Sequence, residues 1–190
     1  MRAPSPLLFL VLALPAVADP APLSDEELAA LVPESRRAAV RETLGLAGDR
    51  GGELSEALRR APEGRREAMA FLVAYLPAAD VAAMSAEDLL ENVRLAEEAR
   101  AATAWAREVP EEVWRAFVLP HRSAQEPFER WRAVFFKELL PRVKGLKSLR
   151  EAALEVNRWA AENVTFQPTT SRDQGPLSTR RRGIGRCEEE

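Results

Sequence analysis

The chain has 190 residues, of which 46% are hydrophobic and 30% are charged, a balance typical of a folded globular protein. That length allows one domain, or one domain and part of a second. The 27 basic and 30 acidic residues give a formal net charge of −3, which argues against a general polyanion-binding protein. We therefore expect no nucleic-acid partner.

The N-terminus predicts export. Arg2 supplies a positive charge before the unbroken apolar run 7–14, and residues 16–18 (Ala-Val-Ala) place small side chains where a signal peptidase reads them. The apolar run is much shorter than the about 20 residues that span a bilayer. We predict a signal peptide over residues 1–18, a periplasmic or extracellular location, and no stable membrane span after cleavage. The alternative is a short membrane anchor or a mobile apolar terminus.

Between residues 19 and 145, proline, glycine and capping residues divide the chain into helices. Ser24 and Ser85 each precede an acid by three residues, the pattern of a capping box. We expect about eight helices in the whole chain, from the spacing of apolar residues and breakers. Their predicted bounds are 25–32, 34–44, 53–60, 62–76, 86–103, 110–119, 127–143 and 149–163.

Several details of these helices are specific enough to check. The second ends at Gly45, and the glycines at 48, 51 and 52 mark a loop. The four tryptophans fall on helical segments, where core packing explains them better than ligand stacking. Two helices have a predicted buried face, formed by Met69, Leu72, Val73 and Leu76 in one and by Phe128, Trp131, Val134, Phe135 and Leu139 in the other.

After residue 163 the pattern changes. Residues 164–167 are a short β-prone run that ends at Pro168. Residues 169–186 show no periodicity and predict an irregular loop. We divide the chain into the signal peptide (1–18), a helical N-terminal region (19–145) and a C-terminal region (146–190).

Cys187 is the only cysteine, so the chain cannot hold an internal disulfide. An unpaired cysteine in an exported protein indicates a reactive thiol, and a buried inert cysteine is the alternative. Gly183 and Gly185 allow a tight turn before it, and the acids 188–190 suit the first turn of a helix. A helix N-terminus stabilises a thiolate. The neighbouring arginines and glutamates act in opposite directions, so the net effect on the thiol pKa stays open.

The segment Gly183-Ile184-Gly185-Arg186-Cys187-Glu188 resembles the nucleophile motif of the transglutaminase-like superfamily, where this pattern opens the central helix of a papain-like core. The preceding residues look like the lead-in of bacterial exported members, and the resemblance covers roughly residues 110–190. The matching segments are Leu119-Pro120-His121-Arg122, Glu126, Trp131-Arg132, Asn157-Arg158-Trp159, Val164-Thr165-Phe166, Arg172-Asp173-Gln174 and Pro176-Leu177.

The resemblance implies a mainly α chain: a helical N-terminal region, then the first helix, short strand and nucleophile loop of a papain-like α+β core. It implies a Cys–His–Asp triad in which Cys187 attacks an amide carbonyl, giving acyl transfer to an amine or hydrolysis by water. In the family the His and Asp follow the Cys helix, so we expect the core to be incomplete here and the chain to be inactive alone. Protein or peptide substrates are implied, cell-wall peptides among them, and no cofactor.

Five further residues are candidates for the cleft. Gln174 could help to hold an oxyanion, with Asp173 beside it, although ordinary turn chemistry is the simpler explanation. His121, the only histidine, lies 66 residues before Cys187, and we expect it to line the cleft or to bond structurally rather than to replace the missing base. Arg122 and Glu126 are four residues apart and pair with each other, with the loop, or only with solvent.

Two other functions fit the same sequence: a helical protein-binding or scaffold module with an incidental thiol, and a transglutaminase-like pseudoenzyme that lacks the triad. One His and one Cys cannot make a four-ligand zinc centre, so we predict no metal site.

Overall fold

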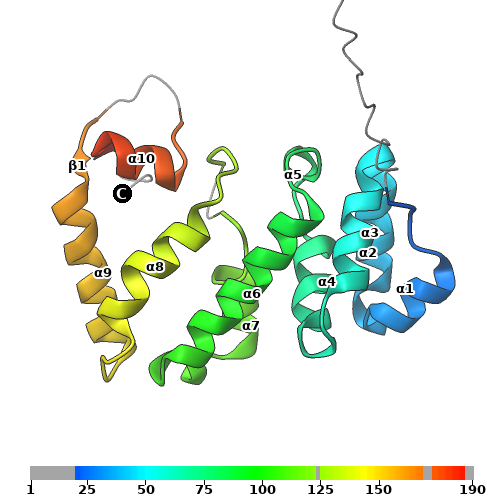
Figure 1. Ribbon diagram of the computed structural model, residues 1–190, viewed down its shortest axis with the longest axis horizontal. Helices are drawn as coiled ribbons and strands as arrows, with labels where there is room; N and C mark the ends of the chain where they lie inside the picture. Colours follow the sequence, from blue (N-terminus) through cyan, green and yellow to red (C-terminus); the bar gives the residue numbers. More distant parts are fainter. Residues whose placement is uncertain (1–19, 123–124, 169–172, 187–190) are drawn as a thin grey trace, which may run out of the picture.

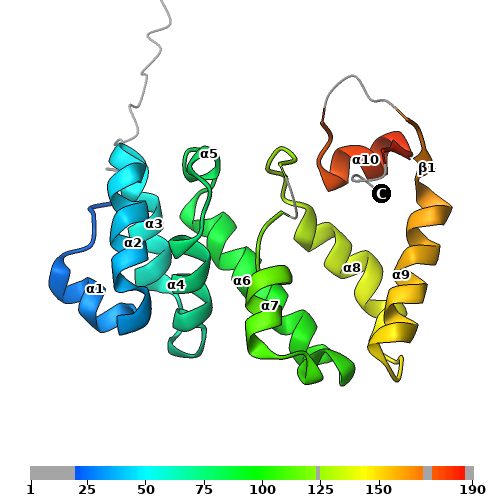
Figure 2. The same cartoon turned by 180° about the vertical axis from the view of Figure 1, so that it is seen from behind.

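A computed structural model describes residues 20–122, 125–168 and 173–186 (Figure 1). The protein is mainly helical, as the sequence predicts. Its helices follow one another from α1 at one end of an elongated molecule to α9 and α10 at the other, which Figures 1 and 2 show from opposite sides. The helices are α1 (Asp25–Leu31), α2 (Glu34–Ala47), α3 (Gly51–Arg60), α4 (Arg66–Ala74), α5 (Ala78–Val81), α6 (Ala86–Ala102), α7 (Glu111–Phe117), α8 (Trp131–Val143), α9 (Leu149–Asn163) and α10 (Pro176–Arg182), with short 3-10 turns at Gly48–Arg50, Glu63–Arg65 and Trp105–Glu108.

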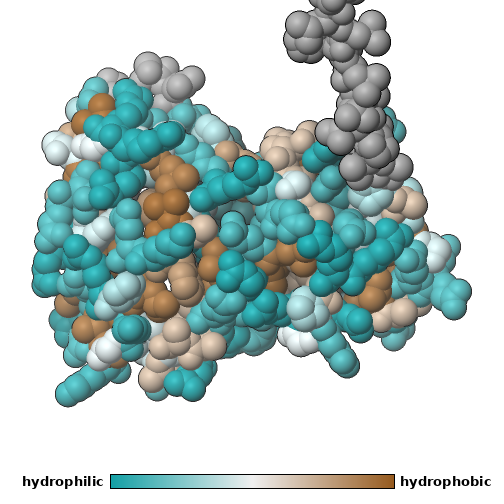
Figure 3. Space-filling model, in the orientation of Figure 1, coloured by the Kyte–Doolittle hydropathy of each residue, from teal (hydrophilic) through white to brown (hydrophobic). Residues whose placement is uncertain are grey.

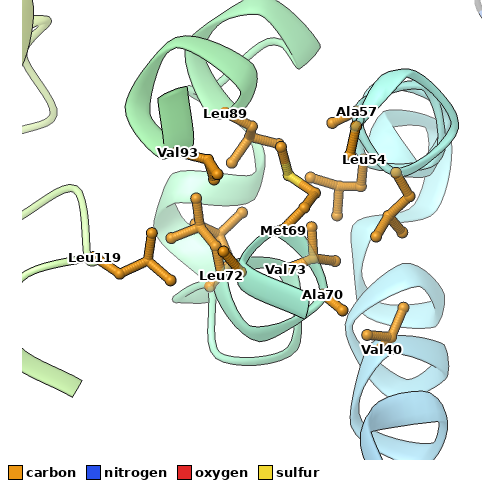
Figure 4. Close-up of a cluster of buried hydrophobic side chains, with 14 of the residues drawn as sticks. Val40, Leu54, Ala57, Met69, Ala70, Leu72, Val73, Leu89, Val93 and Leu119 are labelled. Carbon is orange, nitrogen blue, oxygen red and sulfur yellow. The ribbon is translucent and has the colours of Figure 1, made fainter. Parts of the chain in front are cut away.

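The main hydrophobic core lies among the N-terminal helices. Helix α2 packs on α4, and α3 packs on both α4 and α6. Met69 and Val73 of α4 meet Leu89 of α6 in this core, and Leu119, from the segment after α7, reaches the same cluster (Figure 4). The predicted apolar face of α4 is therefore confirmed. Burying each such side chain adds about 1.5–3 kcal/mol to the free energy of unfolding, so these helices form the main stabilising core of the described residues.

Two serines begin helices as the sequence analysis predicts, and Ser148 begins a third. Ser24 and Ser85 each form a complete capping box, with Glu27 and Asp88 respectively. The hydroxyl of Ser148 accepts a hydrogen bond from the backbone N–H three residues on and caps α9. These caps satisfy N–H groups that have no partner inside the helix, and each is worth about 1 kcal/mol.

The predicted boundary around residue 48 is wrong. Helix α2 continues through Gly45, and Gly48, with a φ of 52°, follows its actual end. Gly51 and Gly52 form the first turn of α3 rather than a loop, and both are buried. A Cβ on Gly52 would collide with the carbonyl of Pro20, so this glycine allows the preceding chain to pack directly on α3.

Helix α8 begins at Trp131 and not at the predicted 127. In residues 127–130 the side chains of Glu129 and Arg130 are bonded to distant elements: Arg130 donates to Asp88, and Glu129 accepts from α10. Those tertiary bonds replace the helical turn that local propensity favours. The predicted buried face of α8 is also wrong in part, because its aromatic residues are half-buried and Val134 is exposed.

The predicted irregular loop over 169–186 is wrong for most of its described part. The predicted β-run forms strand β1 (Thr165–Phe166), which pairs in parallel with β2 (Ile184–Gly185). Helix α10 connects the two strands and ends at Gly183, whose φ of 67° is the left-handed conformation that favours glycine. The chain leading to residue 187 is therefore held by strand pairing.

One half-buried arginine joins α8 to the chain after α7. Arg132 Nε donates to Asn92 Oδ1 of α6 at 2.8 Å, and its Nη2 donates to the carbonyls of Val118 at 2.9 Å and Pro120 at 2.7 Å. The Asn92 amide donates to the carbonyl of Leu119 between them. Burial lowers the pKa of Arg132 to about 10. This bonding fixes segment 118–120 against α8, on which α9 also packs.

Candidate functional site

A groove of about 550 Å³ lies where α7, α8, α9 and α10 meet. Figure 3 shows apolar surface gathered in the half of the molecule that holds α8 and α9. One set of lining residues is apolar: Phe117, Val118, Pro120, Trp131, Phe135, Leu139, Val156, Trp159, Ala160, Val164 and Pro176. The other set is polar: Arg122, Gln125, Glu126, Asp173, Gln174, Thr179, Arg180 and Arg186. A volume of several hundred Å³ with apolar walls and a few polar groups is typical of a ligand site.

Aromatic rings form part of the groove wall. The ring centroids of Trp131 and Phe135 on α8 are 5.8 Å apart, and Phe135 meets Trp159 of α9 edge-on at 5.2 Å. The Arg180 guanidinium of α10 lies 5.7 Å from the Trp159 ring centre, within the range of a cation–π contact. Trp159 is buried, as the prediction for the tryptophans requires, whereas Trp131 is only half-buried and lines the groove. These contacts hold α8, α9 and α10 around one space.

Gln174 is buried at the polar end of the groove, and its side chain braces the C-terminal turn. Its Nε2 donates to the carbonyl of Ile184 at 3.2 Å, and its Oε1 accepts from Arg182 at 2.6 Å. Asp173, the preceding residue, accepts a hydrogen bond from Arg186. Gln174 therefore holds Arg182 and Ile184 in place, shortly before residue 187. Its role at an oxyanion stays a prediction.

Arg122 and Glu126 both line the groove. Arg122 Nη1 donates to the main-chain carbonyl of Glu126 at 3.0 Å, and its Nη2 lies 2.8 Å from Asp80 Oδ2. Among the buried polar atoms of the lining, Arg122 Nε and Thr179 Oγ1 have no hydrogen-bond partner in the residues that the structure describes. A buried group of this kind costs free energy unless something bonds it, so both atoms are available to a ligand.

His121 is separated from the other candidates. It is only 4% exposed, its Nε2 lies 2.8 Å from Asp80 Oδ2, and its ring packs edge-on against Phe128. Burial lowers the pKa of the imidazole below its ordinary value, against the opposing effect of the Asp80 carboxylate. The imidazole is therefore committed to a structural bond, one of the two roles that the sequence analysis expects, and it does not line the groove.

The predicted nucleophile, Cys187, lies outside the described residues, as do Arg172 and the predicted signal peptide. The last described residue is Arg186, whose side chain lines the groove.

Sequence reasoning missed the roles of three residues that build this site. Asp80 accepts from both His121 and Arg122, Arg132 fixes segment 118–120, and Glu129 caps α10. Each acts on a partner that is distant in sequence, so no local spacing could have revealed it.

Comparisons of the chain with protein-family models, with curated proteins and with solved structures find no match. Within the described part of the chain, no group of three or more His, Cys, Asp or Glu residues could hold a metal ion. No helix there is long and apolar enough to cross a membrane. The function must therefore be argued from the groove and the sequence that leads to it.

Proposed function

We propose that this chain carries the nucleophile of an exported transglutaminase-like thiol enzyme that acts on amide bonds of proteins or peptides through Cys187. In this proposal residues 146–190 form the start of a papain-like core. One observation carries it: Asp173, Gln174 and Arg186, which belong to the segment resembling that family, line a single groove with the apolar walls of α8 and α9.

The groove fits a peptide better than a small polar ligand. Trp131, Phe135 and Trp159 offer apolar and aromatic surface to side chains, and the polar end offers donors to carbonyl oxygens. Arg122 Nε and Thr179 Oγ1 are two such donors without a partner in the described residues. A peptide that lies along the groove would have its amide near Arg186, the residue before Cys187.

The reaction follows from thiol chemistry. The Cys187 thiolate attacks the amide carbonyl, a C–S bond forms, and the C–N bond breaks as the amine leaves with a proton. An amine or water then attacks the thioester, releases the thiol, and gives a transferred acyl group or a carboxylic acid. A His and an Asp, which the family resemblance implies as the partners of the nucleophile, would move the protons.

The nucleophile can be tested without those partners, because an activated ester needs no protonation of its leaving group. The thiolate displaces 4-nitrophenolate from a 4-nitrophenyl ester and keeps the acyl group as a thioester. We expect a burst of one nitrophenolate per chain, an added acyl mass on the peptide that contains Cys187, and no burst from Cys187→Ser. A burst of equal size in Cys187→Ser, or a thiol with the ordinary pKa of about 8.5, would refute the proposal.

A binding module is the second candidate, and one observation favours it. Phe117 is 81% exposed at the groove, and Val118 and Val156 beside the groove are exposed as well. Exposed apolar side chains that are grouped mark interaction sites. Binding of a hydrophobic peptide that survives Cys187→Ser unchanged, together with no ester burst from the unaltered chain, would favour this candidate over the enzyme.

A further inference from the structure

Glu129, just before α8, is bonded to the first turn of α10 across 49 positions of sequence. Its Oε2 accepts hydrogen bonds from the backbone N–H groups of Leu177 at 2.7 Å and Ser178 at 3.1 Å, and its Oε1 accepts from the Ser178 hydroxyl. Arg181 Nη2 lies 3.8 Å from the same carboxylate. One side chain thus makes most of the polar contacts at the start of this helix.

Helix α10 depends on this carboxylate because it has no cap of its own. Its N-cap residue is Gly175, which has no side chain to bond the first N–H groups. A Cβ at Gly175 would collide with the Glu129 carboxylate, so the glycine is what allows Glu129 to approach. A carboxylate at a helix N-terminus also complements the helix dipole.

The position of α10 sets the path of the chain toward Cys187. The helix ends at Gly183, whose carbonyl accepts from Thr165 N at 2.8 Å, and the carbonyl of Gly185 accepts from Gln167 N at 2.8 Å. Only Arg186 separates this paired strand from Cys187. A shift of α10 would therefore move the strand that leads to the thiol.

We propose that Glu129 is a positioning residue for Cys187, acting through α10 and β2, an inference that rests on the proposed function of Cys187 as a nucleophile. Glu129 does not touch the reacting atoms. It fixes the helix and the strand from which the chain continues, through Arg186, to Cys187.

Cys187 is the only thiol in the chain, so alkylation reports on this position alone. We would measure the rate of alkylation by iodoacetamide between pH 5 and 10 for the unaltered chain and for Glu129→Gln, Glu129→Ala and Ser178→Ala. Each profile gives two quantities: the thiol pKa and the limiting rate constant of the thiolate. The matched control is Glu53→Gln, because Glu53 also bonds a distant helix start, the N–H of Ala86 at 2.7 Å, but belongs to the N-terminal core.

We expect Glu129→Ala to move the thiol pKa toward its ordinary value by about 0.5–1, which lowers the thiolate fraction at pH 7 about three- to tenfold. Glu129→Gln, which keeps an acceptor oxygen, and Ser178→Ala, which removes one contact, should give smaller changes in the same direction. Glu53→Gln should leave both quantities unchanged even though it lowers the global stability.

The proposal is overturned if Glu129→Gln and Ser178→Ala stay folded and both the pKa and the limiting rate constant match those of the unaltered chain. That result would leave the function of Cys187 standing. An ordinary pKa of the Cys187 thiol in the unaltered chain overturns the proposed function. In that case the limiting rate constants of the variants alone decide whether Glu129 positions the thiol.

Discussion

Arg132→Met is the substitution that most directly tests how the groove is held together. Methionine keeps an apolar stem of similar length but donates no hydrogen bond. The substitution leaves the Asn92 side-chain oxygen and the carbonyls of Val118 and Pro120 without the donor that they have in the structure. The Leu119 carbonyl keeps its bond from the Asn92 amide.

Two opposing effects set the size of the change. Three hydrogen bonds from a charged group, at about 1.5–3 kcal/mol each, stabilise the folded state by about 5–9 kcal/mol. Against this, burial disfavours the charge: the lowering of the Arg132 pKa from 12.5 to about 10 corresponds to about 3 kcal/mol. Water can form hydrogen bonds with the freed carbonyls, which recovers part of the difference between these two effects. We therefore expect Arg132→Met to lower the free energy of unfolding by about 2–4 kcal/mol.

Urea unfolding followed by far-ultraviolet circular dichroism would measure this loss as a lower midpoint at an unchanged m-value. Arg142→Met is the matched control, because Arg142 lies on the same helix and pairs with Glu155 at 3.0 Å while it is partly exposed to solvent. That exposed pair should be worth less than about 1 kcal/mol. A variant Arg132→Met as stable as the unaltered chain would show that the cost of burying the charge equals the gain from its bonds, and would refute this account of how segment 118–120 is held.

Three other substitutions have defined outcomes. Burial lowers the pKa of His121, so below pH of about 6.5 the unfolded chain binds a proton that the folded chain does not. The free energy of unfolding is therefore greatest above this pH and falls as the pH drops below it, by at most about 1.4 kcal/mol per pH unit. His121→Gln should flatten this slope in unfolding curves measured from pH 5.5 to 7.5. A stability that stays constant over this range in the unaltered chain would contradict the assignment. Gly175→Ala should displace Glu129 and cost about 1–3 kcal/mol in the same urea assay, whereas Gly145→Ala, which meets no atom within 4 Å, should cost nothing. Phe117→Ser should change the unfolding free energy by less than about 0.5 kcal/mol but reduce the fluorescence of a groove-bound apolar dye, and unchanged dye binding would place the apolar site elsewhere.

The parts of the fold that sequence predicted are those that depend on neighbours in the chain. Ser24 and Ser85 begin helices because their partners are three residues away, and the apolar face of α4 follows from helical spacing. Helix α10 was missed because its seven residues show no apolar periodicity and its N-cap residue, a glycine, has no side chain; its start is bonded by Glu129 instead. Propensity cannot reveal a bond that forms only after distant segments have packed.

The same distinction applies to the candidate site. Asp173, Gln174, Arg122 and Glu126 were chosen from the residues and from a family resemblance, and the structure brings all four to one groove. The bond between His121 and Asp80 spans 41 positions, so spacing gave no sign of it. The nucleophilic role of Cys187 stays a prediction for the ester and alkylation experiments.

Because α10 is capped by the distant side chain of Glu129, its stability also reports whether a molecule is bound in the groove. A seven-residue helix is far below the length that is stable alone in water, so α10 is helical only while Glu129 and the groove walls hold it. Pro176, Thr179 and Arg180 of this helix line the groove, so any molecule bound there adds contacts to the folded form alone and raises the cost of opening it. Slower hydrogen exchange at the α10 amides would therefore detect an occupant, and comparing peptides by this effect would rank substrates before any turnover is seen.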